Sequence, residues 1–322
     1  MPDMSRREVL RASAFAAAVG LAAPVFLVGT AGAETVPGPA TGFHRYRIGS
    51  VEVTALYDGI WRKPHDPAFI RNASIAETKA ALAAAGQVTD YMPIPLTVQV
   101  LDFGDHYVMI DAGSGAQWQP TAGHIAQNMQ AAGIDPAKIR QILISHFHPD
   151  HVFGLMDRDT NALIYPDAEL VVSAAEYKWW TAPERVGKLP PERKALGTRI
   201  AKVFPAWKNW RLVEGEAEVA PGIRLLPTPG HTPGHSAFHL TSGTDQLMLS
   251  NDVAYVPALL APHPDWQGAY DQDGPAAVVT RRKLLDRVVA EAMPVAGAHF
   301  PFPGAGRFAR DGSAYAFTPV TI

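Results

Sequence analysis

Three of the 12 histidines lie within one short segment, SHFHPDH at residues 145–151. The apolar run QILI precedes this segment and predicts a strand that ends where the histidines begin. Alternate side chains of an extended chain point the same way, so His146 and His148 can bind one metal ion together. The end of the strand would hold both imidazole rings on a rigid platform.

Pro149 interrupts the extended segment and begins a turn. The turn would carry Asp150 and His151 to the other side, where a second ion would lie about 3.5–4 Å from the first. The spacing of these residues therefore favours a site for two metal ions over a site for one.

Other candidate ligands also follow apolar runs, as functional groups at strand ends tend to do. They are His231 and His235 in PTPGHTPGH, Asp252 in MLSND and His299 in VAGAH. Together with the 145–151 segment they supply enough ligands for two ions that share one carboxylate. The residues alone do not decide between His231 and His235, and His299 has an alternative interpretation as a histidine buried in the core.

Cysteine is absent from the 322-residue chain, so any metal must be held by nitrogen and oxygen atoms. Hydrophobic residues make up 47% and charged residues 18%, which is typical of a globular protein with a sizeable core. The formal net charge of -3 provides no basic face for nucleic acid, which we therefore do not expect as a partner.

The first 33 residues have the order of an export signal. A basic start with Arg6 and Arg7 precedes the apolar run 12–33, which ends in a small-residue cleavage site. The paired arginines resemble a twin-arginine signal, so we expect a folded, metal-loaded protein that is periplasmic or secreted. An uncleaved membrane anchor is the alternative, although Pro24 weakens it. After removal of the signal we expect no stable membrane anchor.

Strand and helix patterns alternate from residue 43 onward, after a Pro/Gly-rich linker at 34–42. This alternation predicts an α/β or α+β protein with a single domain over 43–322. The patterns predict a hairpin around Gly49, helices over 74–86, 121–133 and 274–292, and a last strand over 294–300. Ser74 and Glu77 form the capping box of the first helix, and Thr121 would cap the second.

The order of these motifs resembles that of the metallo-β-lactamase superfamily. H-x-H-x-D-H comes first, followed by GHTPGH, an aspartate at a strand end and a late histidine. TALYDG, HPDHVFGLM and GAHFPFPGAG look closest to the branch that contains methyl-parathion hydrolases and acyl-homoserine lactonases. The resemblance implies an αββα sandwich, in which helices flank two mixed β-sheets, from residue 43 to the C-terminus.

The same resemblance implies two sets of three ligands and one bridging carboxylate: His146, His148 and His235 for one ion, Asp150, His151 and His299 for the other, and Asp252 between them. Asp111, in MIDAGSG, matches the aspartate that orients ligand histidines in this family. We expect two divalent ions, zinc first, with manganese, cobalt and iron as alternatives, because nitrogen and oxygen ligands accept all of these metals.

Two divalent ions lower the pKa of a bridging water towards ~7 and polarise an ester or phosphoryl oxygen, which predicts hydrolysis by a bridging hydroxide. Asp150 is the expected proton carrier. Tyr255 follows Asp252 by three residues, a spacing that resembles the lactonases, whose tyrosine donates a hydrogen bond to the substrate. We therefore expect cleavage of lactones or hydrophobic carboxylic esters.

Three other functions stay open at this point. They are an organophosphate triester hydrolase of the methyl-parathion type, a mononuclear iron oxidoreductase on the same fold, and a non-catalytic metal-binding module. For the expected small hydrophobic ester or lactone, an apolar pocket is predicted from Trp179, Trp180, Leu259, Leu260, Trp266 and Tyr270. These side chains would otherwise belong to the core or to a homodimer contact.

Overall fold

A computed structural model of the chain describes residues 39, 41–187, 189 and 191–319. Residues Gly38–Ile322 form one compact unit. The predicted export signal at 1–33 lies outside the described residues, as does most of the predicted linker. Within the described part of the chain, no helix is both long and apolar enough to span a membrane.

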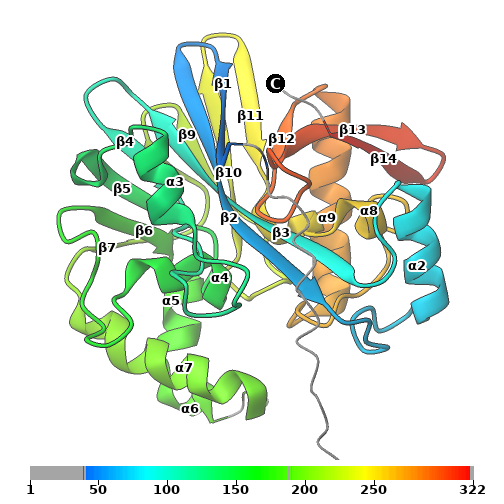
Figure 1. Ribbon diagram of the computed structural model, residues 1–322, viewed down its shortest axis with the longest axis horizontal. Helices are drawn as coiled ribbons and strands as arrows, with labels where there is room; N and C mark the ends of the chain where they lie inside the picture. The colour runs from blue at the N-terminus through cyan, green and yellow to red at the C-terminus, as the bar shows by residue number, and fades with distance from the viewer. Residues whose placement is uncertain (1–38, 40, 188, 190, 320–322) are drawn as a thin grey trace, which may run out of the picture. The chain divides into compact units, whose positions relative to one another are not determined.

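Two sheets of seven strands each form the centre of the described fold (Figure 1). In both sheets the strands lie side by side in chain order. The first sheet contains β1 (Phe43–Ile48), β2 (Val51–Lys63), β3 (Met92–Asp102), β4 (Tyr107–Ile110), β5 (Ile139–Ile144), β6 (Glu169–Ser173) and β7 (Trp210–Val213). Strands β1 to β4 are antiparallel, whereas β4 to β7 are parallel.

The second sheet is antiparallel except where β11 and β12 pair in parallel. It contains β8 (Ala217–Ala220), β9 (Ile223–Pro227), β10 (Ser236–Ser242), β11 (Asp245–Leu249), β12 (Val295–Ala296), β13 (Ala305–Asp311) and β14 (Ala314–Pro319). Both sheets are therefore mixed. Side chains between them form a continuous apolar layer that includes Val53, Leu143 and Phe238.

Helices cover the outer face of each sheet (Figure 1). The first sheet packs against α3 (Ile125–Ala131), α5 (Ala174–Thr181) and α7 (Pro191–Val203), and the second against α2 (Ile75–Ala84), α8 (Pro257–Leu260) and α9 (Gly274–Ala290). Two one-turn helices, α4 (Pro149–Val152) and α6 (Pro183–Val186), lie in the connections. This order of layers confirms the predicted αββα sandwich.

Local signals in the sequence locate several elements correctly. Ile48 pairs with Val51 across the predicted hairpin turn, and the capping box of Ser74 and Glu77 begins α2. The predicted helix over 121–133 is shorter, because Thr121 donates its hydroxyl to Ile60 and the helix begins at Ile125. The prediction that the strand over 294–300 is the last one is wrong, since the hairpin of β13 and β14 follows β12.

Four strand ends meet where the candidate ligands lie. His146 follows β5 of the first sheet, whereas the GHTPGH loop, Asp252 and His299 follow β9, β11 and β12 of the second. A hydrogen bond of 3.0 Å from the Ser236 N–H to the Ser145 carbonyl joins the two sheets at this edge. The sandwich therefore brings ligands that are up to 153 residues apart (146 to 299) to one place.

Candidate metal centre

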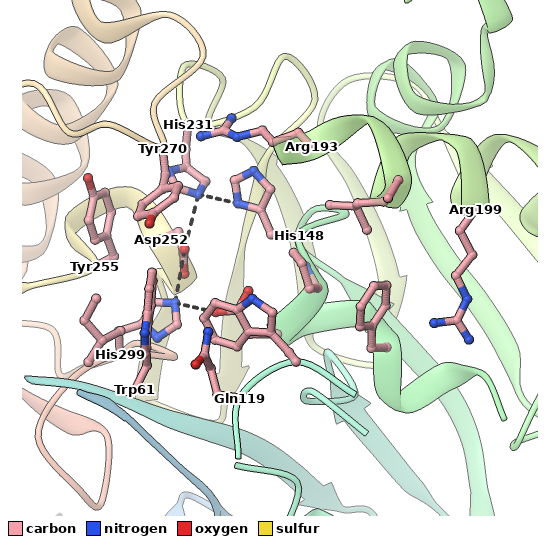
Figure 2. A pocket seen from close by; sticks show the side chains of 17 residues that line it. Trp61, Gln119, His148, Arg193, Arg199, His231, Asp252, Tyr255, Tyr270 and His299 are labelled. Atoms are coloured by element: carbon pink, nitrogen blue, oxygen red, sulfur yellow. Dashed lines mark hydrogen bonds and ion pairs between the residues drawn. The ribbon is translucent and has the colours of Figure 1, made fainter. Parts of the chain in front are cut away.

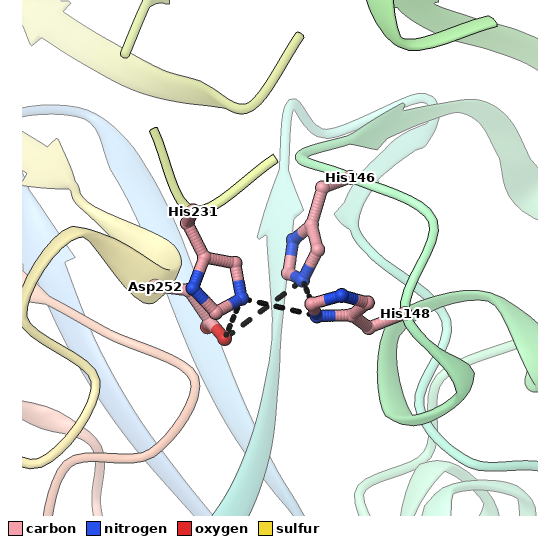
Figure 3. Close-up of side chains that lie close together, drawn as sticks. All are labelled: His146, His148, His231 and Asp252. Atoms are coloured by element: carbon pink, nitrogen blue, oxygen red, sulfur yellow. Dashed lines mark hydrogen bonds and ion pairs between the residues drawn. The ribbon is translucent and has the colours of Figure 1, made fainter. Parts of the chain in front are cut away.

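One group of four buried side chains converges at the edge of the sandwich (Figure 3). The Nδ1 atom of His148 lies 2.9 Å from Nε2 of His146 and 3.0 Å from Nε2 of His231. The carboxylate of Asp252 completes the group, with its Oδ2 atom 3.2 Å from the His231 nitrogen. All four ligand atoms lie within 4.8 Å of one another.

A second group contains Asp150, His151 and His299. Oδ2 of Asp150 lies 3.4 Å from Nε2 of His299 and 3.9 Å from Nε2 of His151. Asp252 also reaches this group, because its Oδ2 lies 3.3 Å from His299 and its Oδ1 lies 3.4 Å from His151. One carboxylate thus contacts histidines of both groups, which is the position expected for a bridging ligand.

The local backbone explains how adjacent residues divide between the groups. His148 is the N-cap of α4, and Pro149 occupies the first helical position, where a missing N–H costs nothing. The chain thus changes from extended to helical between His148 and Asp150. Asp252 lies in a 3-10 turn that begins at Asn251, shortly after β11. The φ of Asn251 is 45°, a strained value for a residue other than glycine.

Asp111 is connected by hydrogen bonds to the Nδ1 atoms of two candidate ligands, His151 and His146. Nδ1 of His151 lies 2.7 Å from Oδ2 of Asp111. Ser145 donates its hydroxyl to the same oxygen at 2.8 Å and lies 3.0 Å from Nδ1 of His146. Asp111 thus contacts His151 directly and His146 through Ser145, and these contacts fix the orientation of the two rings.

Two further partners of the ligand histidines had no signal in the sequence. Asp271 lies 2.9 Å from Nδ1 of His231, and the Pro95 carbonyl lies 2.8 Å from Nδ1 of His299. Asp271 belongs to a polar loop, where its sequence context is that of an ordinary turn residue. Only the fold brings it to a histidine 40 residues away in the chain.

The structure groups His231 with the other candidate ligands and leaves His235 outside that group, so the choice of His235 over His231 stays a prediction. Nε2 of His235 accepts a hydrogen bond of 3.2 Å from the Asp252 N–H, so its lone pair is already used. Nδ1 of the same ring lies 2.8 Å from the Thr228 hydroxyl. Burial lowers the pKa of His235 to about 3, which keeps the ring neutral in this role. His235 supports the Asp252 backbone.

Charges are divided unevenly among the histidines. Burial and the neighbouring histidines hold the pKa values of His146 and His148 well below the usual range. For His231, burial lowers the pKa, but the carboxylates of Asp252 and Asp271 outweigh burial and raise the value to about 9. A cation at the centre would replace this proton as the partner of the carboxylates.

The donor atoms fit divalent metal ions. Nε2 of His151 and Oδ1 of Asp252 are buried without a hydrogen-bond partner among the described residues, a costly state that a coordinated ion would relieve. Imidazole nitrogens and carboxylate oxygens suit zinc and the other metals predicted from the sequence. Two sets of ligands joined by Asp252 match the predicted number of ions.

A cavity of about 480 Å³ opens beside these ligands (Figure 2). Its apolar wall is aromatic: Trp61 meets Trp118 edge to face at a centroid distance of 4.9 Å, and Tyr270 lies 6.0 Å from Trp61. Arg193 and Arg199 of α7 also line the cavity. An apolar group and a polar acceptor can therefore both be accommodated beside the metal ligands.

Five of the six predicted pocket residues lie elsewhere, and Tyr270 alone of the six lines the cavity. Trp180, Leu259 and Leu260 are fully buried in the helix-facing cores, where the indole N–H of Trp180 is also hydrogen-bonded. Trp179 packs against Trp180, and Trp266 stacks on His263 at 3.9 Å. Aromatic composition did not distinguish core from wall. Trp61 and Trp118 were missed because they lie far from the ligands in sequence, and Phe153 was missed although it lies only two residues after His151.

The ring of Tyr255 lines the cavity, at a centroid distance of 5.4 Å from His231. Its hydroxyl is buried without a hydrogen-bond partner among the described residues. Burial raises its pKa well above the usual value, so the hydroxyl stays a donor. The hydroxyl lies against Gly268, where an added Cβ would be 1.4 Å away.

A family model described as "Metallo-beta-lactamase superfamily" matches residues 97–299, more than half of the chain. An N-acyl homoserine lactonase from Bacillus sp is 30% identical over 132 residues, which are 41% of this chain and 45% of that relative. This chain therefore matches about half of the length of that curated relative.

Two solved structures share the fold over most of their length. AidC, a dizinc quorum-quenching lactonase in complex with a product, has a TM-score of 0.79 and 25% identity, covering 88% of this chain and 98% of that chain. The hydrolase AbOPH, in the beta lactamase superfamily, has a TM-score of 0.81 and 25% identity, covering 88% and 99%.

Proposed function

This chain belongs to the metallo-beta-lactamase superfamily, and from that membership we propose that it is a metal-dependent hydrolase of lactones or hydrophobic carboxylic esters with two divalent ions. The observation that carries the proposal is Asp252, which contacts histidines of both ligand groups and also lines the cavity. His146, His148 and His231 would hold one ion, and Asp150, His151 and His299 the other.

Divalent ions in this position would activate a water molecule and polarise a carbonyl oxygen. Asp150 lines the cavity and is less buried than the histidine ligands. A carboxylate in that place can accept the proton of the attacking water at its free oxygen and return it to the leaving alkoxide. The chain needs no nucleophilic side chain of its own for such a reaction.

The cavity wall supports the proposed substrates. Trp61, Trp118 and Phe153 offer apolar surface for an acyl chain or an aryl group. Two solved relatives of the same fold are named a quorum-quenching lactonase and a hydrolase. Lactones with an apolar substituent therefore fit both the wall and the comparisons.

A substrate panel with metal quantification tests the proposed function. Purified protein should contain two divalent ions per chain and hydrolyse γ-lactones and aryl esters without consuming oxygen. A content of one iron per chain, together with oxygen uptake, would show that the protein is an oxidoreductase and not a hydrolase. Protein that retains two ions but leaves lactones, aryl esters and phosphotriesters intact would refute it.

Replacement of Tyr255 by phenylalanine tests the lactone preference. The Tyr255 hydroxyl lies against Gly268 and would have to turn towards the substrate to donate to it. Loss of that hydrogen bond, about 1.4 kcal/mol, should lower lactone turnover about 10-fold. Turnover of a phosphotriester should change less. Tyr177→Phe removes a hydroxyl outside the cavity and serves as the control. Equal losses on both substrates would show that Tyr255 only shapes the wall.

A further inference from the structure

A buried glutamate lies behind the metal ligands and contacts none of them. Glu176, in the first turn of α5, is fully buried, and it is the only buried glutamate in the described part of the chain. The described residues place no Lys, Arg or His within ion-pair distance of its carboxylate. A carboxylate in this setting needs hydrogen-bond donors.

Four donors point at the two oxygens. Oε1 accepts the Phe147 N–H at 2.9 Å and the Trp180 indole N–H at 2.8 Å. Oε2 accepts the Thr232 hydroxyl at 2.7 Å and the Gly234 N–H at 3.0 Å. Burial raises the pKa of Glu176, whereas the four hydrogen bonds oppose that shift by stabilising the charged carboxylate.

These donors belong to the two loops that carry the first ligand group. Phe147 lies between His146 and His148, whereas Thr232 directly follows His231. The hydrogen bond between Ser236 and Ser145 joins the strand ends, but Glu176 joins the loops at the ligands themselves.

The backbone confirms how closely the second loop approaches α5. A Cβ atom at Gly234 would lie 2.0 Å from the Glu176 nitrogen, so only glycine allows this contact. The second glycine of GHTPGH thus has a physical role, which is to let the loop reach the carboxylate.

We propose that Glu176 is a positioning residue for one metal ion: its carboxylate sets the separation between the His146/His148 loop and the His231 loop. This inference rests on the proposed two-ion centre. The contacts of Glu176 do not extend to Asp150, His151 or His299, so its loss should weaken one ion and spare the other.

Glu176→Gln is the decisive variant. A carboxamide has only one acceptor oxygen, so in either orientation its NH₂ group faces at least one of the three N–H donors. The affinity for one of the two ions should fall about 10- to 100-fold, as for other residues that orient ligands. Chelator competition with metal quantification measures this change, and the cobalt-substituted protein should lose the absorption of one site.

Two further variants complete the design. Glu169→Gln, a partly exposed glutamate on β6, keeps wild-type affinities for both ions. Thr232→Val removes a single donor to Glu176 and should lower the affinity for the same ion by a smaller factor. This variant tests the role of Glu176 if Glu176→Gln does not fold. Wild-type protein without two ions would instead contradict the proposed function.

Retention of both ions at wild-type affinity in Glu176→Gln would overturn the inference. Equal weakening of both ions would also overturn it, because that result indicates a general structural role. If Glu176→Gln does not fold, unchanged affinities in Thr232→Val have the same consequence.

Discussion

Two histidines with identical chemistry stand four residues apart in GHTPGH, and their neighbours give them different roles. Nε2 of His231 faces the other ligands, while Asp271 holds the opposite nitrogen. Nε2 of His235 is occupied by the Asp252 N–H. A nitrogen that accepts a backbone hydrogen bond has no lone pair left for a metal. The hydrogen-bond partners of each ring therefore decide whether its Nε2 atom is available to a metal ion.

Replacement of each histidine by alanine separates these roles. His231→Ala should lose one ion per chain and lower turnover at least 100-fold, since a ligand is removed. His235→Ala should keep both ions but lower the free energy of unfolding by about 1–3 kcal/mol, because the buried Asp252 N–H loses its acceptor. Metal quantification and urea denaturation measure the two effects. Loss of an ion in His235→Ala with retention in His231→Ala would reverse the assignment.

The apolar runs led to most of the residues that the structure brings together in the two groups. Six of the seven predicted ligands lie in the two groups, and His235 is the exception. The exception and the missed Asp271 have one cause: their roles depend on hydrogen bonds across the fold. A local pattern contains no information on such partners.

At the scale of elements, α9 supports the metal centre from behind through one arginine. Arg281 is fully buried and donates to the carbonyls of Val253, Pro264 and Trp266 and to Oδ2 of Asp271. It therefore connects the helix to the residue after Asp252 and to the aspartate that holds His231. Apolar periodicity predicted α9 well, but it could not predict a charge on the buried face.

Arg281→Met should destabilise the fold, because it removes one of the two buried partners of Asp271, the other being His231, and leaves three carbonyls without donors. We expect a loss of about 3–5 kcal/mol in the free energy of unfolding, measured by urea denaturation. Arg282→Met on the same helix is the matched control, since its ion pair with Asp265 is partly exposed to solvent and contributes about 1 kcal/mol. Similar losses in both variants would argue against a special role for Arg281.

At the scale of the molecule, the proposed metal centre joins the two sheets. Ligands after β5 come from the first sheet, and ligands after β9, β11 and β12 come from the second. The resemblance predicted this sandwich, whereas most of the pocket could not be predicted, because its walls include distant segments such as those of Trp61 and Trp118. Ions that bind ligands of both sheets would stabilise their association.

Removal of the metals should therefore lower the thermal stability of the whole fold. Ions present at about 100 times their dissociation constant stabilise the native state by about 2.7 kcal/mol each, if the unfolded chain does not bind them. For a chain of this size each ion should raise the melting temperature by about 4–5 °C. Thermal unfolding before and after chelation, with zinc returned to the chelated sample, measures the difference. In Asp252→Ala this difference in melting temperature should be smaller, because the carboxylate shared by both groups is missing. An unchanged melting temperature after complete chelation would show that the sheets associate without help from the ions.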